Sequence, residues 1–330
     1  MLHEMLKNGM HHVVIEVSSH ALSLYRVHGL SFKTAIFTNL SQDHLDFHAD
    51  MDEYAAAKSK LFKKATVCII NNDDARSSQM ISASSGEVIT YGVNKRSDVM
   101  AENIRINPEG MSFEIFGKYG RYKINVHLTG EFNVYNILAA FSAAVVQGYE
   151  ARQIIAALEN INTVPGRFEI IKKGQPFTVI IDYAHTPDGL ENILITAKNI
   201  ANNRLITVFG CGGDRDATKR PLMGEIAANY SDYVVITSDN PRTEDPNKII
   251  EDVIKGVFRV KRHGARVMYS IIENREKAIF HAIKQAQQGD VVVIAGKGHE
   301  TYQIIGNTRY NFDDKEVAAK ALEEWGYEKF

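Results

Sequence analysis

Four loops in the second half of the sequence carry charged side chains at positions where a ligand site could form. Each loop follows an apolar run, in the segments FTVIIDYAHTPDGL, RLITVFGCGGDRD, DYVVITSDNPRTEDP and DVVVIAGKGHETYQ. If the four runs are parallel strands, the loops lie together at one edge of a sheet, where α/β proteins bind ligands. A single charged loop is more often a solvated connection, so the prediction depends on this convergence.

The chemistry of these loops favours a ligand that carries carboxylates and an amine. A guanidinium group binds a carboxylate through two hydrogen bonds, and Arg215 and Arg242 supply two such groups. Glu300 could accept hydrogen bonds from an ammonium group of the same ligand. The three side chains together predict an amino-acid site.

A second candidate site lies in the segment DHLDFHADMDEYAAAKSKLF, residues 43–62. His44 follows the predicted strand TAIFTNL, and Glu16 ends the predicted strand HHVVIEV, so neighbouring parallel strands would bring both side chains to one edge. Magnesium accepts carboxylates readily and imidazole less often. An ammonium group has no acceptor, so Lys58 could join a metal site only as a carbamate formed with carbon dioxide. From spacing alone, an ordinary exposed lysine is the favoured interpretation.

The elements that must position these residues form two series of strands and helices. In residues 1–164, apolar runs alternate with helical patterns and are followed by hairpins over 98–130 and helices over 133–148 and 150–161. Pro165 and Gly166 interrupt this series, and a new strand–helix alternation follows. The pattern predicts an α/β protein with a mostly parallel sheet in domain 1–164 and a Rossmann-like α/β domain over 165–330.

The composition excludes several classes of protein. The chain has 330 residues, 45% of them hydrophobic and 24% charged, which is typical of a globular protein. Its 38 basic and 40 acidic residues nearly balance, so we expect no nucleic-acid partner and no anionic membrane surface. No apolar run approaches the roughly 18 residues of a membrane span. With only 2 cysteines, a reducing cytoplasm is the expected location. We also expect a monomer.

The order of the motifs resembles that of the Mur ligases, and within this family the MurE type. The similarity covers essentially all 330 residues and rests on EVSSHAL, FTNLSQDHLDFH, YAAAKSKLF, GEFNVYNILAA, PGRFE, DYAHTPDGL, GCGGDRDATKRPLMG, SDNPRTEDP and AGKGHETYQ. The resemblance implies an ATP-dependent amide ligase that adds meso-2,6-diaminopimelate to UDP-MurNAc-L-Ala-D-Glu in peptidoglycan synthesis. ATP would phosphorylate the D-Glu carboxylate, and the amine of diaminopimelate would attack the resulting acyl phosphate.

The resemblance also implies a role for each matching residue. Magnesium would be held by Glu16, His44 and a carbamylated Lys58. The UDP-MurNAc-dipeptide would contact Ser18 and Arg26. ATP would be held by Asn133, Asn136, Arg167, Asp182 and His185. The amino-acid site would consist of Arg215, Asp239, Asn240, Pro241, Arg242, Gly296 and Glu300.

The tetrapeptide DNPR at 239–242 bears on specificity. Relatives that add diaminopimelate carry it, whereas those that add lysine generally lack its arginine. Diaminopimelate has a second carboxylate at its far end, where lysine has a hydrogen. Arg242 would pair with that carboxylate, and lysine would leave a buried arginine unpaired.

The sequence departs from the family pattern in two respects. Position 24 is Leu, where many relatives carry a polar residue that touches the muramoyl substrate. The sequence also contains no G-x-x-x-x-G-K-[ST] phosphate loop, and AGKGHE does not match it because Gly298 follows Lys297. Mur ligases carry such a loop and a UDP-binding domain before it, so we expect an N-terminally truncated chain with little or no turnover alone. Two alternatives are a non-catalytic remnant that binds diaminopimelate and a ligase for another amino acid. DNPR argues against the latter.

Overall fold

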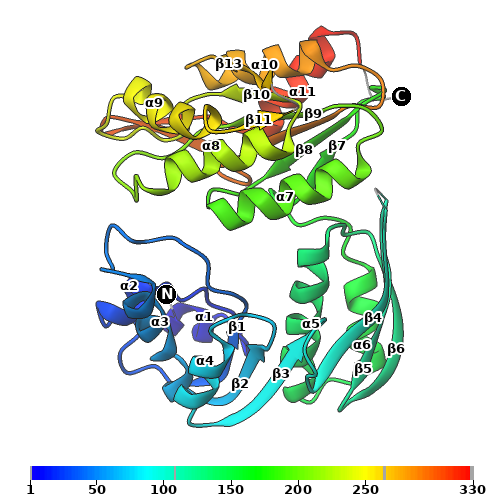
Figure 1. Cartoon of the computed structure of the whole chain (residues 1–330). Helices are drawn as coiled ribbons and strands as arrows, with labels where there is room; N and C mark the ends of the chain where they lie inside the picture. The colour runs from blue at the N-terminus through cyan, green and yellow to red at the C-terminus, as the bar shows by residue number, and fades with distance from the viewer. Residues whose placement is uncertain (1, 108, 263–264, 328–330) are drawn as a thin grey trace.

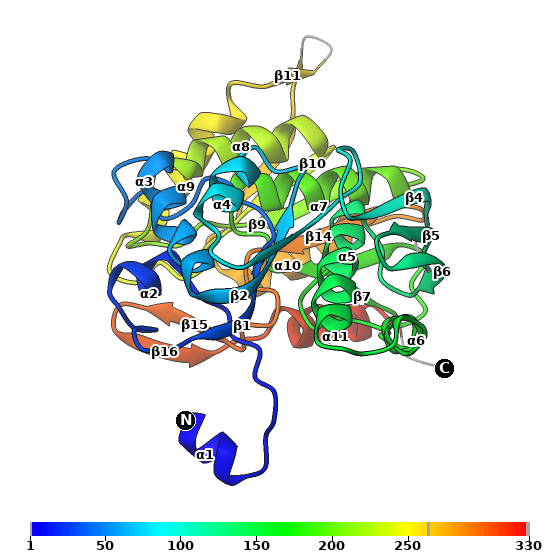
Figure 2. The same ribbon diagram turned by 90° about the horizontal axis from the view of Figure 1, so that it is seen from below.

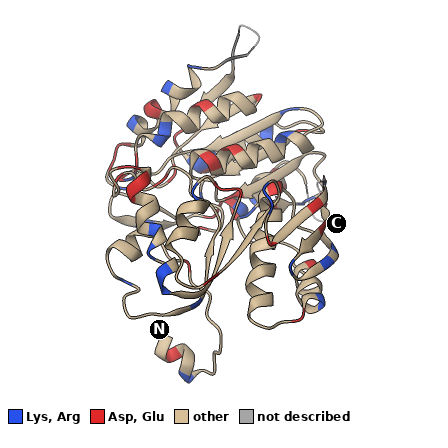
Figure 3. Cartoon of the chain, turned by 60° about the horizontal axis from the view of Figure 1, so that its bottom comes forward, with Lys and Arg blue, Asp and Glu red and all other residues tan. Residues whose placement is uncertain are grey.

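The computed structural model describes residues 2–107, 109–262 and 265–327 and contains two six-stranded sheets in separate halves of the chain. Figure 1 shows one layered unit built on each sheet, with the N-terminal half below and the C-terminal half above. Lysine, arginine and acidic residues are mixed over both units (Figure 3). No helix in the described part of the chain is long and apolar enough to cross a membrane.

The first sheet is parallel over four strands and antiparallel over the last hairpins. Its strands in order are β1 (Phe32–Phe37), β2 (Ala65–Asn71), β3 (Glu87–Gly92), β4 (Val99–Asn107), β5 (Gly110–Gly117) and β6 (Gly120–Val126). The last four residues of the parallel strand β2 are all buried, whereas buried and partly exposed positions alternate along the antiparallel strand β5, as expected for a strand with one solvated face. The predicted hairpins are therefore confirmed.

Helices cover both faces of this sheet. The larger apolar cluster combines β3–β6 with α5 (Glu131–Val146) and α6 (Ala151–Glu159). A smaller cluster packs β1 and β2 against α3 (Met51–Ser59), α4 (Ser77–Ala83) and the short 3-10 helix Phe62–Lys64. Helix α3 ends at Ser59, and the chain turns there before the 3-10 helix.

The strand predicted to end at Glu16 is wrong. Residues 8–18 form no regular element between α1 (Leu2–Lys7) and α2 (Ser19–Ser23), and Val14 is 98% exposed. Figure 2 shows α1 standing away from the body of the molecule. An apolar run becomes a buried strand only where neighbouring strands satisfy its backbone and cover its faces. In the described sheet β1 is the edge strand, and residues 11–17 do not pair with it.

The second sheet has the predicted Rossmann-like arrangement. Its strands in order are β13 (Met268–Ile271), β10 (Tyr233–Ile236), β9 (Leu205–Phe209), β14 (Val291–Ala295), β8 (Thr178–Asp182) and β7 (Glu169–Ile171). All pairs are parallel except that of β7 with β8. One face is covered by α7 (Pro187–Ile200), α8 (Lys219–Tyr230) and α9 (Pro246–Val257), and the other by α10 (Arg275–Gln285) and α11 (Asp314–Glu324).

Two short hairpins extend from the second unit. One consists of β11 (Lys261–Arg262) and β12 (Ala265–Arg266), and the other of β15 (Tyr302–Ile305) and β16 (Thr308–Asn311). The second hairpin follows the last of the four predicted loops and is therefore close to the candidate site.

Helices α8 and α9 meet with their backbones in contact. A Cβ atom built on Gly256 would lie 1.8 Å from the carbonyl oxygen of Pro221, and one on Gly224 would lie 2.0 Å from that of Val253. Any side chain at these positions must push the helices apart.

We expect Gly256→Ala to lower the free energy of unfolding by about 1–3 kcal/mol, because an overpacked core must shift its backbone. Urea denaturation followed by circular dichroism measures the change. The matched control is Lys248→Ala on the exposed face of α9, which should alter stability by less than about 0.5 kcal/mol. Equal midpoints for wild type and Gly256→Ala would contradict the close helix contact.

Candidate active site

The four predicted loops do converge at one edge of the second sheet. Strands β10, β9, β14 and β8 are adjacent and parallel, with Ile236 opposite Phe209 and Ala295 opposite Asp182. The loops that begin after these residues therefore leave the sheet at the same end.

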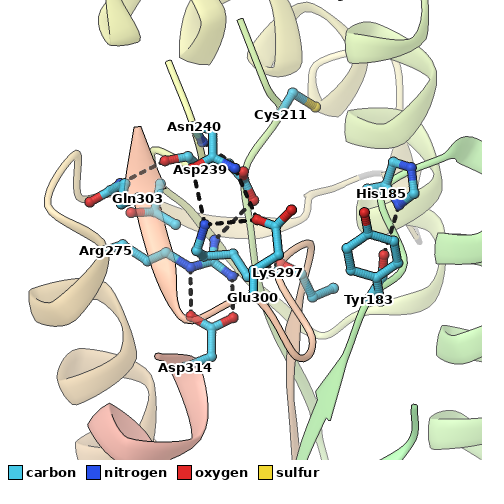
Figure 4. A network of polar contacts seen from close by, with 12 residues as sticks. Tyr183, His185, Cys211, Asp239, Asn240, Arg275, Lys297, Glu300, Gln303 and Asp314 are labelled. Atoms are coloured by element: carbon cyan, nitrogen blue, oxygen red, sulfur yellow. Dashed lines mark hydrogen bonds and ion pairs between the residues drawn. The ribbon is translucent and has the colours of Figure 1, made fainter. Parts of the chain in front are cut away.

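The amide side chain of Asn240 joins three segments of this edge (Figure 4). Its Nδ2 donates to Glu300 Oε2 at 3.0 Å, and its Oδ1 accepts from the backbone N–H of Ile304 at 2.9 Å and from Lys297 Nζ at 3.1 Å. Asn240 is 3% exposed, so these contacts pair a buried polar group as burial requires.

Lys297 is a site residue that the sequence predictions did not include. It is fully buried, and its Nζ also lies 3.2 Å from Glu300 Oε2. Part of the acceptor capacity of Glu300 is therefore used within the protein. The available signal was the position of Lys297 immediately after a strand, which places it at the same edge as Asn240.

A buried ion pair lies beneath the loop that contains Asp239. Arg275 donates to both carboxylate oxygens of Asp314 at 2.7 Å and to the carbonyl of Ala295 at 2.9 Å. Its Nη1 is buried without a hydrogen-bond partner and lies 3.9 Å from Asp239 Oδ2. A side chain at Gly296 would meet Asp239 Oδ2 at 2.7 Å, which explains the glycine at that position.

The structure places Arg215 and Arg242 on two adjacent loops, after β9 and after β10, and leaves Arg242 partly exposed. Arg242 Nη1 donates to the carbonyl of Gly213 at 2.7 Å, and Arg215 Nη1 donates to that of Asp214 at 2.8 Å. Hydrogen bonds from Thr243, helped by the charges of both arginines, hold the pKa of the Asp214 carboxyl below its usual value. The expectation of a buried arginine left unpaired by lysine is wrong. Discrimination would depend on charge pairing with the second carboxylate.

The loop of Arg242 has a backbone that other segments hold in place. Arg242 has a φ of 52°, a left-handed conformation that is uncommon outside glycine. Its N–H donates to Ile304 at 3.1 Å, and its carbonyl accepts from Gly306 at 2.7 Å, so the β15–β16 hairpin fixes it. Pro241 is buried beside it.

In the first unit, Lys58 and His44 lie on the same aromatic ring. Lys58 Nζ is 5.8 Å from the centroid of the Tyr54 ring, and the ring centroids of His44 and Tyr54 are also 5.8 Å apart. Burial lowers the pKa of Lys58 below its ordinary value, although the negative charges of Glu16 and Asp43 oppose this. Glu16 is exposed on irregular chain, so its proximity to Lys58 does not come from the predicted strand.

The side chains around Lys58 fit magnesium only after modification. Among the described residues, no three His, Cys, Asp or Glu side chains are close enough to hold a metal ion. Glu16 offers carboxylate oxygens and His44 an imidazole, and Lys58 would add oxygen ligands only as a carbamate. Carbamate formation requires the neutral amine, which the lowered pKa of Lys58 favours.

The residues assigned to ATP fall in two groups. Asn133 and Arg167 line a pocket of about 440 Å³ between the two units, together with His127, Thr129, Asn162, Lys172 and others. Asn133 is buried and accepts from Asn136 Nδ2 at 3.0 Å. Arg167 lies over the ring of Tyr183, 4.8 Å from its centroid.

The second group consists of Asp182 and His185, whose side chains contact other segments of the protein. Both carboxylate oxygens of Asp182 accept backbone hydrogen bonds at 2.8 Å, one from Phe168 and one from Ala184. Asp182 thus holds the linker that carries Arg167. The Nδ1 of His185 lies 2.9 Å from the carbonyl of Tyr183, and its Nε2 faces Asp43.

Ser18 and Arg26 lie at the start of α2 and just beyond its end. Ser18 Oγ accepts from the N–H of Ala21 at 3.2 Å and caps α2, so part of its hydrogen-bonding capacity is structural. Arg26 is exposed three residues beyond that helix.

The sequence predictions also missed Asp43 and Lys219. Lys219 Nζ in the second unit lies 3.1 Å from Asp43 Oδ1 in the first. Burial of Asp43 would raise the pKa of its carboxyl, but the hydrogen bond with His185 and the charge of Lys219 hold it well below its usual range. The carboxylate of Asp43 is therefore charged at neutral pH.

Comparisons with known proteins agree with this arrangement. The sequence profile of the Mur ligase middle domain matches residues 1–144, and that of the Mur ligase, glutamate ligase domain matches residues 166–298. Two α/β units with a polar site at the strand edge define a ligand-binding α/β protein. The chain belongs to the Mur ligase family.

Curated relatives of high similarity carry one name, UDP-N-acetylmuramoyl-L-alanyl-D-glutamate--2,6-diaminopimelate ligase. The protein of Geobacillus kaustophilus is 47% identical and that of Syntrophomonas wolfei 51% identical, over 98% and 94% of this chain. The chain spans 67% and 64% of the length of these two relatives.

Solved structures show the same architecture. A solved structure of a ligase of that name is 37% identical to this chain, with a TM-score of 0.63. The match covers 98% of this chain and 67% of the chain in that structure. A pseudomurein peptide ligase type C from Methanothermus fervidus shares the fold with a TM-score of 0.70 at 19% identity, over 94% of this chain and 66% of its own.

The lowered pKa of Lys58 predicts a pH-dependent gain in stability for Lys58→Met. The charged amine is disfavoured in the folded state below its folded pKa, so removing it should stabilise the protein at pH 7. The gain should shrink as the pH rises toward the ordinary lysine pKa of about 10.4, above which the unfolded lysine is also neutral.

Urea denaturation in carbon dioxide-free buffer at neutral and alkaline pH measures this difference. The control is Lys60→Met. Lys60 is the exposed C-cap residue of α3, so the variant should show little gain in stability at either pH. A gain for Lys58→Met that is constant with pH would show that the amine is not desolvated.

Proposed function

We propose that this chain comprises two domains, 1–164 and 165–330, of an ATP-dependent ligase that adds meso-2,6-diaminopimelate to UDP-MurNAc-L-Ala-D-Glu. The reaction would belong to peptidoglycan synthesis in the cytoplasm, with the chain acting as a monomer. The observation that supports this most directly is the strand edge where the buried Asn240 is hydrogen-bonded to Glu300 and Arg242 donates to Gly213 in the loop that carries Arg215. The names of the curated relatives support the same substrates.

The C-terminal site would orient diaminopimelate by its charges. Arg242 and Arg215 would bind the carboxylate at the far end, and Glu300 would accept from the ammonium group. Asp239, Asn240, Pro241 and Gly296 would hold this geometry, because their side chains or backbone are buried and paired with neighbouring loops. The free amine of the ligand would then be directed toward the first domain.

The amine would attack an acyl phosphate made from the D-Glu carboxylate and the γ-phosphoryl group of ATP. Negative charge gathers on the phosphoryl and acyl oxygens and must be neutralised. Magnesium supplies the neutralising positive charge when bound. Glu16, His44 and the carbamate of Lys58 are the proposed ligands. Asn133, Asn136 and Arg167 would hold the nucleotide at the interdomain pocket, with Asp182 and His185 supporting them. Ser18 and Arg26 would contact the UDP-MurNAc-dipeptide.

Isothermal titration calorimetry of the full chain with diaminopimelate and with lysine tests the specificity. We expect diaminopimelate to bind, and Arg242→Ala to weaken it by about tenfold or more, because a charged hydrogen bond contributes about 1.5–3 kcal/mol. Arg259→Ala removes an exposed arginine on the far side of α9 and should leave binding unchanged. Lysine that binds as well as diaminopimelate would overturn the assignment.

The same titration bears on the alternative of a non-catalytic protein that binds diaminopimelate. Both functions predict binding, but only a ligase forms the amide bond with ATP and the UDP-MurNAc-dipeptide. Product formation above background would therefore exclude the non-catalytic function.

The proposed carbamate can be observed directly. In ¹³C-bicarbonate buffer, we expect a protein-bound carbamate carbon in the NMR spectrum of wild type that is lost in Lys58→Met. The signal should survive in Lys60→Met. Spectra without any such signal in wild type, at saturating bicarbonate and magnesium, would exclude a carbamate at Lys58.

A further inference from the structure

Two neighbouring side chains of the first domain reach across to the second. Asp43 Oδ1 lies 3.1 Å from Lys219 Nζ, and Asp43 Oδ2 lies 3.6 Å from His185 Nε2. Beside it, Gln42 Nε2 donates to Thr218 Oγ1 at 3.1 Å. The loop after β1 is therefore bonded to the residues that begin α8.

Lys219 is buried in this contact. It is 5% exposed, and the side chain of Asp43 is 15% exposed. Breaking one side of a buried ion pair leaves an uncompensated charge, whereas separating both charges into water hydrates them. An intermediate separation of the two domains is therefore unfavourable, and the pair favours either a closed or a fully open arrangement.

Each partner is held rigidly within its own domain. Lys219 is the first residue of α8, and Asp216 Oδ1 just before it accepts from the N–H of Thr218 at 2.8 Å. In the first domain, Asp43 Oδ1 accepts from the N–H of His44 at 2.9 Å. The same carboxylate oxygen thus contacts both the other domain and the backbone of His44.

The backbone of His44 needs this support. His44 has a φ of 58°, and a non-glycine residue in this region persists only where its surroundings determine the conformation. Its imidazole faces Tyr54, beside Lys58. A displacement of Asp43 would therefore release the backbone conformation that directs the His44 side chain toward Tyr54 and Lys58.

We propose that Asp43 and Lys219 form an interdomain latch, in which closure of the two domains and fixing of the His44 backbone are one coupled step. Lys219 is then a positioning residue that acts through Asp43 on a side chain of the other domain. This proposal rests on the proposed function only in giving His44 a role in the site. Formation of the latch itself requires neither amino acid nor nucleotide.

The test measures the distance between the domains in the full chain without ligands. Fluorophores are placed on Ser78→Cys in α4 and Glu251→Cys in α9, both exposed positions, while the native Cys68 and Cys211 are buried. We expect Lys219→Met and Asp43→Asn each to lengthen the mean distance by single-molecule energy transfer. The double variant should lengthen it no further, because both changes remove one interaction.

A second readout follows His44 itself. Hydrogen exchange of the His44 N–H should become about tenfold faster or more in Lys219→Met, because its acceptor, Asp43 Oδ1, is then no longer held by Lys219. Lys219→Arg should restore both the distance and the protection. The control Lys198→Met removes an ion pair of 2.7 Å with Asp232 inside the second domain and should change neither.

The outcomes decide the proposal without reference to catalysis. If Lys219→Met and Asp43→Asn, both folded by circular dichroism, leave distance and exchange as in wild type, the latch is wrong. If Asp43→Asn opens the domains and Lys219→Met does not, His185 and not Lys219 is the partner and the assignment of Lys219 fails. Failure of diaminopimelate to bind would refute the proposed function and leave these measurements intact.

Discussion

The physical constraint on which the C-terminal site depends is the burial of the Asn240 amide. A buried amide must have its donors and acceptors paired, and the partners of Asn240 are Lys297, Glu300 and the backbone of Ile304. Lys297 and Glu300 belong to the loop after β14, Ile304 belongs to the β15–β16 hairpin, and Asn240 itself lies in the loop after β10. Satisfying one side chain therefore fixes three segments relative to one another, and with them the positions of Arg242 and Glu300.

The two halves of the site differ in how far they are preorganised. Beneath the C-terminal loops, the buried pair of Arg275 and Asp314 ties α10 to α11, and removing one partner of such a pair costs about 3–5 kcal/mol. In the first domain, Glu16 lies on exposed irregular chain, and Lys58 could offer oxygen ligands only as a carbamate. The amino-acid half is thus built by the fold, whereas the metal half would form only with modification and ligand binding.

The contact between the domains relates these halves. The loop after β1 carries Asp43 and His44, and the loop before α8 carries Arg215 and Thr218, which accepts a hydrogen bond from Gln42 of the first domain. Because each loop contains both a proposed site residue and a residue of the interdomain contact, movement of one domain alters the geometry of both sites. Because of this linkage, a ligand bound at one part of the site would favour closure of the domains over the other part.

The sequence by itself determined the α/β class, the second sheet and the convergence of its four loops. These follow from local apolar periodicity, which depends on few neighbours. Only the tertiary structure decided that residues 11–17 are not a strand, because pairing needs an adjacent strand that no local pattern supplies. It also decided the contact of Asp43 with Lys219, which are 176 residues apart, and the use of Asp182 to hold the linker. Burial and pairing between distant segments depend on packing, which residue types and their spacing do not specify.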